Sequence, residues 1–384
     1  MQIQMEDVNT TETSSLPNKG SAETGLLDVQ VGLTLFGIVC FIVSTVGNCT
    51  VIHLIRTRMH MRNVTNILIA NMSAADLLMT ILVFPYLIKF YYIGSKWFGG
   101  IAGSVTCTVV HSSQMVSIFG SVYTLLVISV DRCLAVMQPM KKYFTKTVTK
   151  WSIVLVWLVS VIFSIPLMIA LKVINDDTGY HCVEDWGKMD QSLYIIMFLL
   201  LTYIVPLGLI GSVYTVTGRK LWGCGTAKSQ ENPLNRSNHE SVRASRRKAT
   251  KMLVTVVVLF ALCWFPLQVR ELIHVTWPDT LRRIPIKLDM LLPWFGFFNS
   301  CTNPIIYVIF SDRFRREFKR VLCFWKRHED IDVFSTPGSP VTRTRLATIR
   351  KQQYSNLTPL GTPDLSERSP RVPKPSLLSQ KSSL

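Results

Sequence analysis

Seven long apolar runs constrain the fold of this chain more than any other feature of its sequence. Each run has about 20 residues or more with few charges, the length that a helix needs to cross roughly 30 Å of hydrocarbon. Backbone polar groups in lipid must be satisfied internally, which leaves helices and closed barrels, and these runs are too long for barrel strands. The sequence therefore predicts an all-α membrane protein, a seven-transmembrane helix bundle, with helices at about 29–56, 65–92, 103–137, 150–171, 191–218, 250–276 and 287–310.

The charged residues between the runs predict which way the bundle faces. The chain carries a formal net charge of +17, with its bases concentrated in 56–62, 138–150 and 219–251 and mostly acids in 1–28 and 172–190. Loops rich in Lys and Arg stay in the cytoplasm. We therefore expect a multi-pass plasma-membrane protein with its N-terminus outside and its C-terminus in the cytoplasm. The positive charge then reflects topology and contact with membrane lipids, not nucleic-acid binding.

The segments that flank the bundle have their own compositions. Residues 1–28 are expected to form an extracellular tail ahead of the bundle at 29–310. In 311–323, apolar residues recur at helical spacing between bases, which predicts a short amphipathic helix on the cytoplasmic membrane surface. Residues 324–384 are rich in Ser, Thr, Pro, Lys and Arg, a composition that predicts a disordered cytoplasmic tail.

Several positions are candidates for covalent modification. Asn9 lies in the pattern "NTT", a glycosylation acceptor. The predicted topology places Cys107 and Cys182 on the oxidising side, where a disulfide between them is expected. Cys323 follows the amphipathic stretch and is either a palmitoylation site or an ordinary interfacial cysteine.

The predicted tail also carries candidate regulatory features. Its last residues, "SSL", fit a peptide that binds a PDZ domain, although three residues also match by chance. Phosphates on its Ser-Pro and Thr-Pro steps would add negative charge for a partner to bind. These steps begin at Thr336, Ser339, Thr358, Thr362 and Ser369.

Polar residues inside the apolar runs form an ordered series of short motifs, and polar residues at membrane depth are functional by default. The series comprises Asn48 in "GN", Asp76 in "MSAADLLM", "DRC" at 131–133, Trp157, Pro206, "CWFP" at 263–266 and "NPIIY" at 303–307. In this order, one to a helix, the motifs resemble those of rhodopsin-like (class A) G-protein-coupled receptors. The resemblance covers roughly residues 28–323.

This resemblance implies a signalling mechanism. Such a receptor activates a heterotrimeric G protein when helix 6 moves outward, and it binds arrestin after its tail is phosphorylated. Asp131 pairs with Arg132 in the resting receptor, and the pair opens on activation so that Arg132 faces the G protein. The other residues that the resemblance assigns to this switch are Tyr214, Asn303, Pro304 and Tyr307.

The resemblance also implies a sodium site as an allosteric modulator, with no other cofactor. Its centre is Asp76, and the remaining oxygen donors are Ser121, Asn299 and Ser300. Oxygen ligands of this kind suit a hard cation. A protonated, hydrogen-bonded Asp76 is the alternative.

The ligand is predicted from a second level of resemblance. Gln114 stands where receptors for biogenic amines carry an Asp, and "CVEDW" (182–186), "WFG" (97–99) and "VTNILIANMSAADLL" resemble receptors for peptides ending in Arg-Phe-amide and their orexin and neuropeptide Y relatives. The resemblance predicts an extracellular neuropeptide. A non-peptide ligand, a lipid or an amine, is the alternative.

The candidate ligand-binding residues follow from the chemistry of such a peptide. An Arg side chain of the ligand needs carboxylates, because charge-assisted hydrogen bonds are among the stronger ones. Gln114 and Gln268 are expected to bind a terminal amide, and Trp264 and Phe298 to form the floor for an aromatic ring. The expected carboxylates are Glu184, Asp185 and Glu271, with solvated loop charges as the alternative reading and with basic Arg270 nearby as a departure from the pattern.

Two other classes of protein fit the sequence less well. A transporter or channel predicts internal repeats, paired broken helices and pore-lining charges, and the sequence has no sign of these. An enzyme requires a convergent nucleophile, base or metal motif, which the sequence also lacks. We therefore expect a receptor and not an enzyme.

Overall fold

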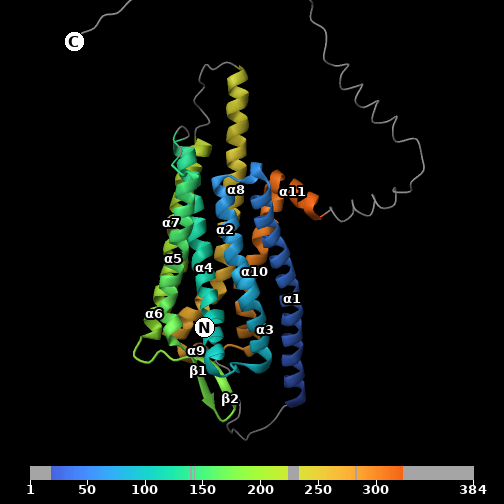
Figure 1. Cartoon of the computed structure of the whole chain (residues 1–384), viewed down its shortest axis with the longest axis vertical. Helices are drawn as coiled ribbons and strands as arrows, with labels where there is room; N and C mark the ends of the chain where they lie inside the picture. The colour runs from blue at the N-terminus through green and yellow to red at the C-terminus, as the bar shows by residue number, and fades with distance from the viewer. Residues whose placement is uncertain (1–18, 139–140, 142, 224–232, 282, 323–384) are drawn as a thin grey trace, which may run out of the picture. The chain divides into compact units, whose positions relative to one another are not determined.

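The computed structural model describes residues 19–138, 141, 143–223, 233–281 and 283–322. Within them the chain is almost entirely helical, apart from one two-stranded hairpin (Figure 1). Asn9, Cys323, the Ser-Pro and Thr-Pro steps and the C-terminal "SSL" lie outside the described residues. Chain order is α1(Lys19–Thr57), α2(Val64–Leu78), α3(Phe84–Ile93), α4(Gly100–Met137), α5(Lys146–Ala170), β1(Leu171–Asp176), β2(Gly179–Glu184), α6(Gln191–Leu199), α7(Val205–Gly223), α8(Pro233–Thr276), α9(Pro278–Leu281), α10(Ile286–Phe310) and α11(Asp312–Leu322).

Two of the predicted spans are continuous helices that contain a π-helical turn. Met79–Val83 joins α2 to α3, and Leu200–Ile204 joins α6 to α7. A proline follows each turn within a few residues, at Pro85 and Pro206. Because proline lacks an N–H and clashes with the carbonyl four residues earlier, a local widening of the helix accommodates it.

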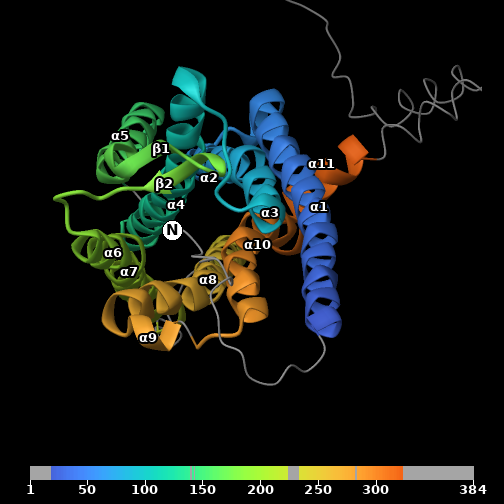
Figure 2. The ribbon, with the colours of Figure 1, turned by 90° about the horizontal axis from the view of Figure 1, so that it is seen from below.

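Six segments are long and apolar enough to cross a membrane: 27–57, 64–93, 100–137, 146–170, 191–223 and 242–276. The seventh predicted span, α10, does not meet that standard of composition, because it carries a row of polar residues. These residues are nevertheless buried, and α10 packs between α1 and α8 (Figure 2). The row comprises Asn299, Ser300, Thr302 and Asn303.

The prediction of a basic loop at 219–251 is largely wrong, because most of this segment is helical. Helix α7 continues to Gly223, and α8 begins at Pro233, well before the predicted start of that span. Its sequence "RASRRKATK" is rich in Ala, Arg and Lys, which favour helix. The part of α8 that precedes the predicted span, 233–249, is here called the basic extension of α8. It projects beyond the apolar part of the helix.

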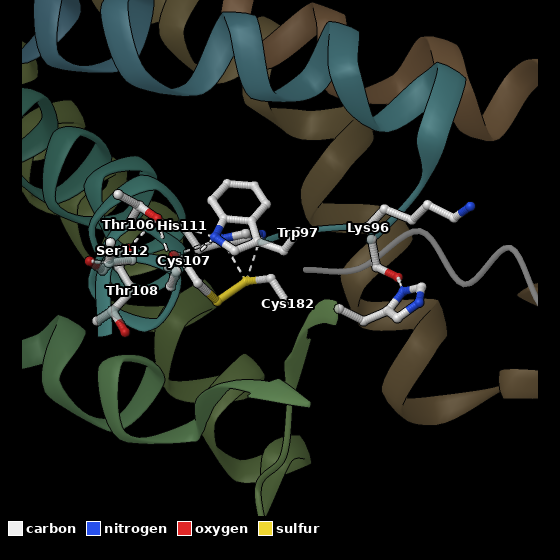
Figure 3. The surroundings of a disulfide bond; sticks show 12 residues. Lys96, Trp97, Thr106, Cys107, Thr108, His111, Ser112 and Cys182 are labelled. Carbon is white, nitrogen blue, oxygen red and sulfur yellow. Dashed lines mark hydrogen bonds between the residues drawn. A yellow bond between two sulfur atoms is a disulfide. The ribbon is translucent and has the colours of Figure 1, made fainter. Parts of the chain in front are cut away.

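The hairpin lies across one end of the bundle, here called the hairpin end. Strands β1 and β2 pair antiparallel from Leu171–Glu184 to Asp176–Gly179, and Gly179 adopts φ 118° at the turn. The predicted disulfide is confirmed: Cys107 on α4 is bonded to Cys182 on β2, with a Cα–Cα distance of 5.8 Å (Figure 3). It fixes the hairpin to the start of α4.

Trp97 reinforces this attachment. Its backbone N–H donates to Tyr180 O at 2.7 Å, and its indole Nε1 donates to Gly103 O at 2.9 Å. The indole packs beside the disulfide (Figure 3). The "WFG" motif thus holds the segment before α4 against both the hairpin and the disulfide.

The opposite end of the bundle, here called the α11 end, carries the short amphipathic helix. Phe314 and Phe318 are buried on one face of α11, at the i, i+4 spacing of a helix. Glu317 lies 3.2 Å from Arg58, in the connection between α1 and α2, and 2.6 Å from Arg320. The contact with Arg58 holds α11 against the start of the bundle, whereas Arg320 lies on α11 itself.

Candidate ligand-binding site and signalling switch

A cavity of ≈ 120 Å³ opens at the hairpin end. It brings together Glu184 from β2 and Glu271 from α8, although 87 residues separate them in the chain (271 − 184). Glu184 accepts a hydrogen bond from Trp186 Nε1 at 3.1 Å. The remaining lining residues are Met115, Leu167, Trp186, Gln191, Tyr194, Ile195, Phe198, Arg270 and His274.

Arg270 is buried beside this cavity and bridges two acids. Its Nε and Nη2 donate to the two carboxylate oxygens of Asp289 on α10, at 2.6 and 3.3 Å, and its Nη1 donates to Glu271 Oε1 at 3.0 Å. A buried charge is tolerated when it is paired and hydrogen-bonded, and the Arg270 side chain is only 4% exposed. Sequence reasoning noted Arg270 as a base but missed Asp289, which lies in the first turn of α10 and at the start of the seventh predicted span.

Two predicted ligand-binding residues point elsewhere. Asp185 is exposed and paired with Lys172 at 2.7 Å, a hydrogen bond that lowers the pKa of its carboxyl. Consecutive residues of an extended segment point in opposite directions, so Glu184 faces the cavity and Asp185 does not.

Phe298, the second of these residues, was expected to form the pocket floor but points away from the cavity in this structure. Its side chain is 41% exposed and stacks on Phe36 of α1, with ring centroids 6.1 Å apart. The preceding residue, Phe297, is 2% exposed and lines a small cavity of ≈ 30 Å³ together with the predicted Gln114. One step along a helix rotates a side chain by about 100°, so Phe297 points into the bundle and Phe298 points out of it.

Trp264 and Gln268 lie deeper on the same face of α8 as Glu271, at helical spacing. Both are buried. The Trp264 ring packs beside Phe260, with centroids 6.2 Å apart, and against Gly296 of α10. Among the described residues Trp264 Nε1 donates no hydrogen bond and Gln268 Oε1 accepts none. This column of side chains runs from the cavity toward the middle of the bundle.

Asp76 is the centre of a buried polar cluster midway along the bundle. Its Oδ2 accepts from Asn303 Nδ2 at 2.9 Å, and Ser300 also hydrogen-bonds its carboxylate. Within the described part of the chain, Asn299 Oδ1 accepts no hydrogen bond although Asn299 is 4% exposed. Ser121 is equally buried on α4. The predicted residues therefore offer buried oxygen donors of the kind that a sodium ion requires.

Asp131 and Arg132 form an ion pair toward the α11 end. Arg132 Nη2 lies 2.7 Å and Nε 3.0 Å from Asp131 Oδ2, and Thr65 of α2 donates to the same oxygen at 3.0 Å. Arg132 also donates to the Thr65 hydroxyl. Thr65 was not among the predicted residues, because nothing in the sequence marks it as a neighbour of "DRC".

The other predicted switch residues lie on α7 and α10. Tyr214 lies near Ser129 and Arg132. Tyr307 is fully buried and packs against Phe314 of α11, with centroids 5.6 Å apart. Pro304 packs against Gly47 of α1, so the break in α10 is seated on α1.

A second cavity, of ≈ 550 Å³, opens at the α11 end. Arg132 lines it, together with residues of α2, α8, α10 and α11. The cavity lies between the helices that the predicted switch would separate. Lys248 is one of its lining residues from α8, and Asp312 is one from α11.

The basic extension of α8 is tied to two neighbours that sequence reasoning missed. Lys248 Nζ lies 2.6 Å from Asp312 Oδ2 on α11. Arg243 Nη2 and Arg247 Nη2 donate to Leu221 O near the end of α7, at 2.7 and 2.8 Å. Bases near a helix C-terminus interact favourably with its last carbonyls, so this contact joins α8 to α7.

Comparison with known proteins agrees with this architecture. Residues 47–307 match the family described as 7 transmembrane receptor (rhodopsin family). The RYamide receptor of Tribolium castaneum is 30% identical, over 82% of this chain and 88% of the relative. The galanin receptor 2a of Danio rerio is 31% identical, over 76% and 78%. The tachykinin-like peptides receptor 99D of Drosophila melanogaster is 32% identical, over 78% and 60%.

These relatives are signalling receptors and not enzymes, as the sequence predicted. The family match also accounts for α10 as the seventh span, because it extends through Tyr307. The ordered motifs, the disulfide and the matched relatives lead to one conclusion. The chain belongs to the rhodopsin family of seven-transmembrane receptors.

Proposed function

We propose that this receptor binds an extracellular neuropeptide at the hairpin end and activates a heterotrimeric G protein at the α11 end. The observation that carries the proposal is the cavity in which Glu184 and Glu271 meet. Two carboxylates in a partly buried cavity favour a ligand with a cationic side chain. The relatives are named as receptors for RYamide, galanin and tachykinin-like peptides, which favours a peptide over a lipid or an amine.

The proposed orientation follows the positive-inside rule. The hairpin end and the N-terminus face the extracellular side, and the basic extension of α8 faces the cytoplasm. The plasma membrane is the proposed location. Contacts between basic residues and lipid head groups, and arrestin binding to a phosphorylated tail, belong to the same proposal.

The structure supports a route for the signal. A ligand that engages Glu271 acts on α8, whose inward-facing residues lead to Trp264. Pro266 lies inside α8, near Trp264, and is the proposed hinge, since proline removes a backbone hydrogen bond. Outward movement of the part of α8 between this hinge and the α11 end enlarges the cavity lined by Arg132. The Asp131–Arg132 pair then opens and Arg132 meets the G protein.

A sodium ion at Asp76 fits the same scheme as an allosteric modulator. Ser121, Asn299 and Ser300 are the remaining proposed ligands. A bound sodium ion would neutralise the buried carboxylate, which is costly to leave unpaired at this depth. The unpartnered Asn299 Oδ1 is the observation that favours an ion over hydrogen bonding alone.

A second-messenger assay in cells that express the receptor tests the proposal. The panel contains amidated peptides ending in Arg-Phe and Arg-Tyr, galanin-like and tachykinin-like peptides, lipids and amines. We expect a response to a cationic peptide that Glu271→Gln weakens by about ten-fold or more. Asp185→Asn is the matched control, because its carboxylate is exposed and faces Lys172.

The contrary results are equally specific. A response confined to lipids or amines would replace the proposed ligand class. An equal response in the wild type and Glu271→Gln, at matched surface expression, would remove the cavity from the proposal.

A further inference from the structure

The cavity at the hairpin end contains a base, Arg270, as well as acids. Arg270 is adjacent in sequence to Glu271 and hydrogen-bonded to it at 3.0 Å. An isolated Arg–Glu pair is neutral and offers little attraction to a cationic ligand. The presence of Arg270 would therefore cancel one of the two carboxylates on which the proposed function depends.

Asp289 changes this balance. Both of its oxygens accept from Arg270, Oδ1 from Nε at 2.6 Å and Oδ2 from Nη2 at 3.3 Å. This two-pronged contact is the stronger geometry for an Arg–carboxylate pair. Glu271 receives a single hydrogen bond, at Oε1, and among the described residues its Oε2 accepts none. The cluster of one base and two acids has a formal charge of −1.

The three charged side chains are largely buried, which strengthens their effect on a ligand in the cavity. The side chains of Arg270, Glu271 and Asp289 are 4%, 11% and 15% exposed, so solvent screens their charges less than at an open surface. Glu271 and Arg270 line the cavity, whereas Asp289 is not among its lining residues. Asp289 therefore acts on the cavity through Arg270.

We propose that Asp289 is a specificity-determining residue: by occupying Arg270 it keeps Glu271 available for a guanidinium group of the ligand. This inference rests on the proposed function and deepens it, because it assigns the preference for a cationic ligand to a residue on a different helix. Without the Asp289 carboxylate, Arg270 turns both prongs of its guanidinium to Glu271. The pair then becomes neutral, Glu184 is left as the other carboxylate of the cavity, and the preference weakens.

Equilibrium binding to the purified receptor tests the inference with two probes that differ in one charge. Arg-Phe-amide carries the guanidinium, and citrulline-Phe-amide replaces it with a neutral urea of nearly the same shape. We expect the wild type to prefer the Arg probe by about ten-fold or more, the usual effect of a hydrogen bond to a charged group. Asp289→Asn should reduce that preference several-fold, to the part that Glu184 supplies, and leave the affinity for the citrulline probe unchanged.

A rescue variant separates this role from a structural one. In Arg270→Met/Asp289→Asn the competing base is absent, so Glu271 is free again and the preference for the Arg probe should return. Asp279→Asn is the matched control, since Asp279 is an exposed acid at the same end of the bundle, on α9. It should keep the wild-type preference.

Three results would overturn the inference. They are a wild type without preference for the Arg probe, an Asp289→Asn variant that retains it in full or loses both probes equally, and a double variant that does not regain it. If Asp289→Asn does not fold, the double variant and Asp289→Glu supply the comparison, and loss of the preference in Asp289→Glu would count against the inference. The proposed function fails separately, when no peptide evokes signalling although the purified receptor still distinguishes the probes.

Discussion

Lys248 of α8 and Asp312 of α11 form an ion pair in which Nζ lies 2.6 Å from Oδ2. Arg132, by contrast, finds its described partners in Asp131 and Thr65, on α4 and α2. The α11 end of α8 is thus attached to α11 and, through Leu221 O, to α7. An outward swing of α8 must break the contact with α11, while α7 is free to move with α8.

Charge reversal at Lys248 should therefore raise signalling in the absence of agonist. Lys248→Glu places two acids together and removes a contact made in the resting arrangement. The Asp312 side chain is 61% exposed, and a solvated aspartate is ionised at neutral pH, so the two acids repel each other in the variant. The increase should be modest, about two- to three-fold, because exposed ion pairs are weak. Basal second-messenger output at matched surface expression is the measurement.

The exchanged pair Lys248→Glu/Asp312→Lys is the control for this prediction. It restores opposite charges and should return basal output to the wild-type level. Basal output that stayed high in the exchanged pair would show that each side chain acts independently of the other.

Asp131→Asn should raise basal signalling more strongly. Asp131 is 7% exposed and is the only acid described beside Arg132, so the amide leaves Arg132 without its charged partner. Loss of a charge-assisted contact predicts an increase on the order of ten-fold. Thr65→Val removes only the hydroxyl that touches both residues and should have a smaller effect. Arg132→Ala should abolish the agonist response, and a full response in that variant would disprove the switch.

Gly296→Ala tests the packing of α10 against Trp264. A Cβ at this glycine would lie 2.9 Å from Trp264 Cζ3, so the indole must shift or the helices must separate. Overpacking of this kind costs about 1–3 kcal/mol, and we expect a lower melting temperature in detergent together with altered basal signalling. Gly208→Ala on α7 has nothing within 4 Å of the added atom and should behave as the wild type.

Sodium should stabilise the purified wild-type receptor through Asp76. We expect its melting temperature to rise when sodium chloride replaces choline chloride at constant ionic strength, because an ion that binds only the folded state shifts the unfolding equilibrium. Asp76→Asn should remove this dependence. Ser117→Ala is the control. It loses a hydrogen bond to the backbone oxygen of Ala75, the residue before Asp76, and should keep the dependence on sodium. A wild-type melting temperature that is the same in sodium chloride and in choline chloride would refute the sodium site.

Removal of the disulfide should loosen the hairpin end. The bond closes a sequence separation of 75 residues, for which loop-closure entropy corresponds to about 4 kcal/mol. Cys107→Ala/Cys182→Ala should therefore lower thermal stability and weaken ligand binding, because Glu184 lies two residues after Cys182 on the same strand. Cys49→Ser, a free exposed cysteine on α1, should leave both unchanged.

The sequence identified the elements of this receptor with few errors. The seven apolar runs, the order of motifs and the cysteines on one side of the predicted bundle led to the fold, the family and the disulfide. These features are local or depend on topology, and the membrane limits the possible solutions to few. The extension of α8 into the predicted basic loop was missed because charge signals orientation and not the end of a helix.

The sequence alone predicted an acidic ligand-binding site and an Asp–Arg switch for this chain. Only the tertiary structure decided which side chains face each other: Phe297 and not Phe298 turned inward, and Arg270 and Lys248 each paired with an acid 19 and 64 residues away. Pairings at that separation are set by the rotation and packing of whole helices. A rotation by one residue, about 100°, would exchange every partner while leaving the pattern of the sequence unchanged.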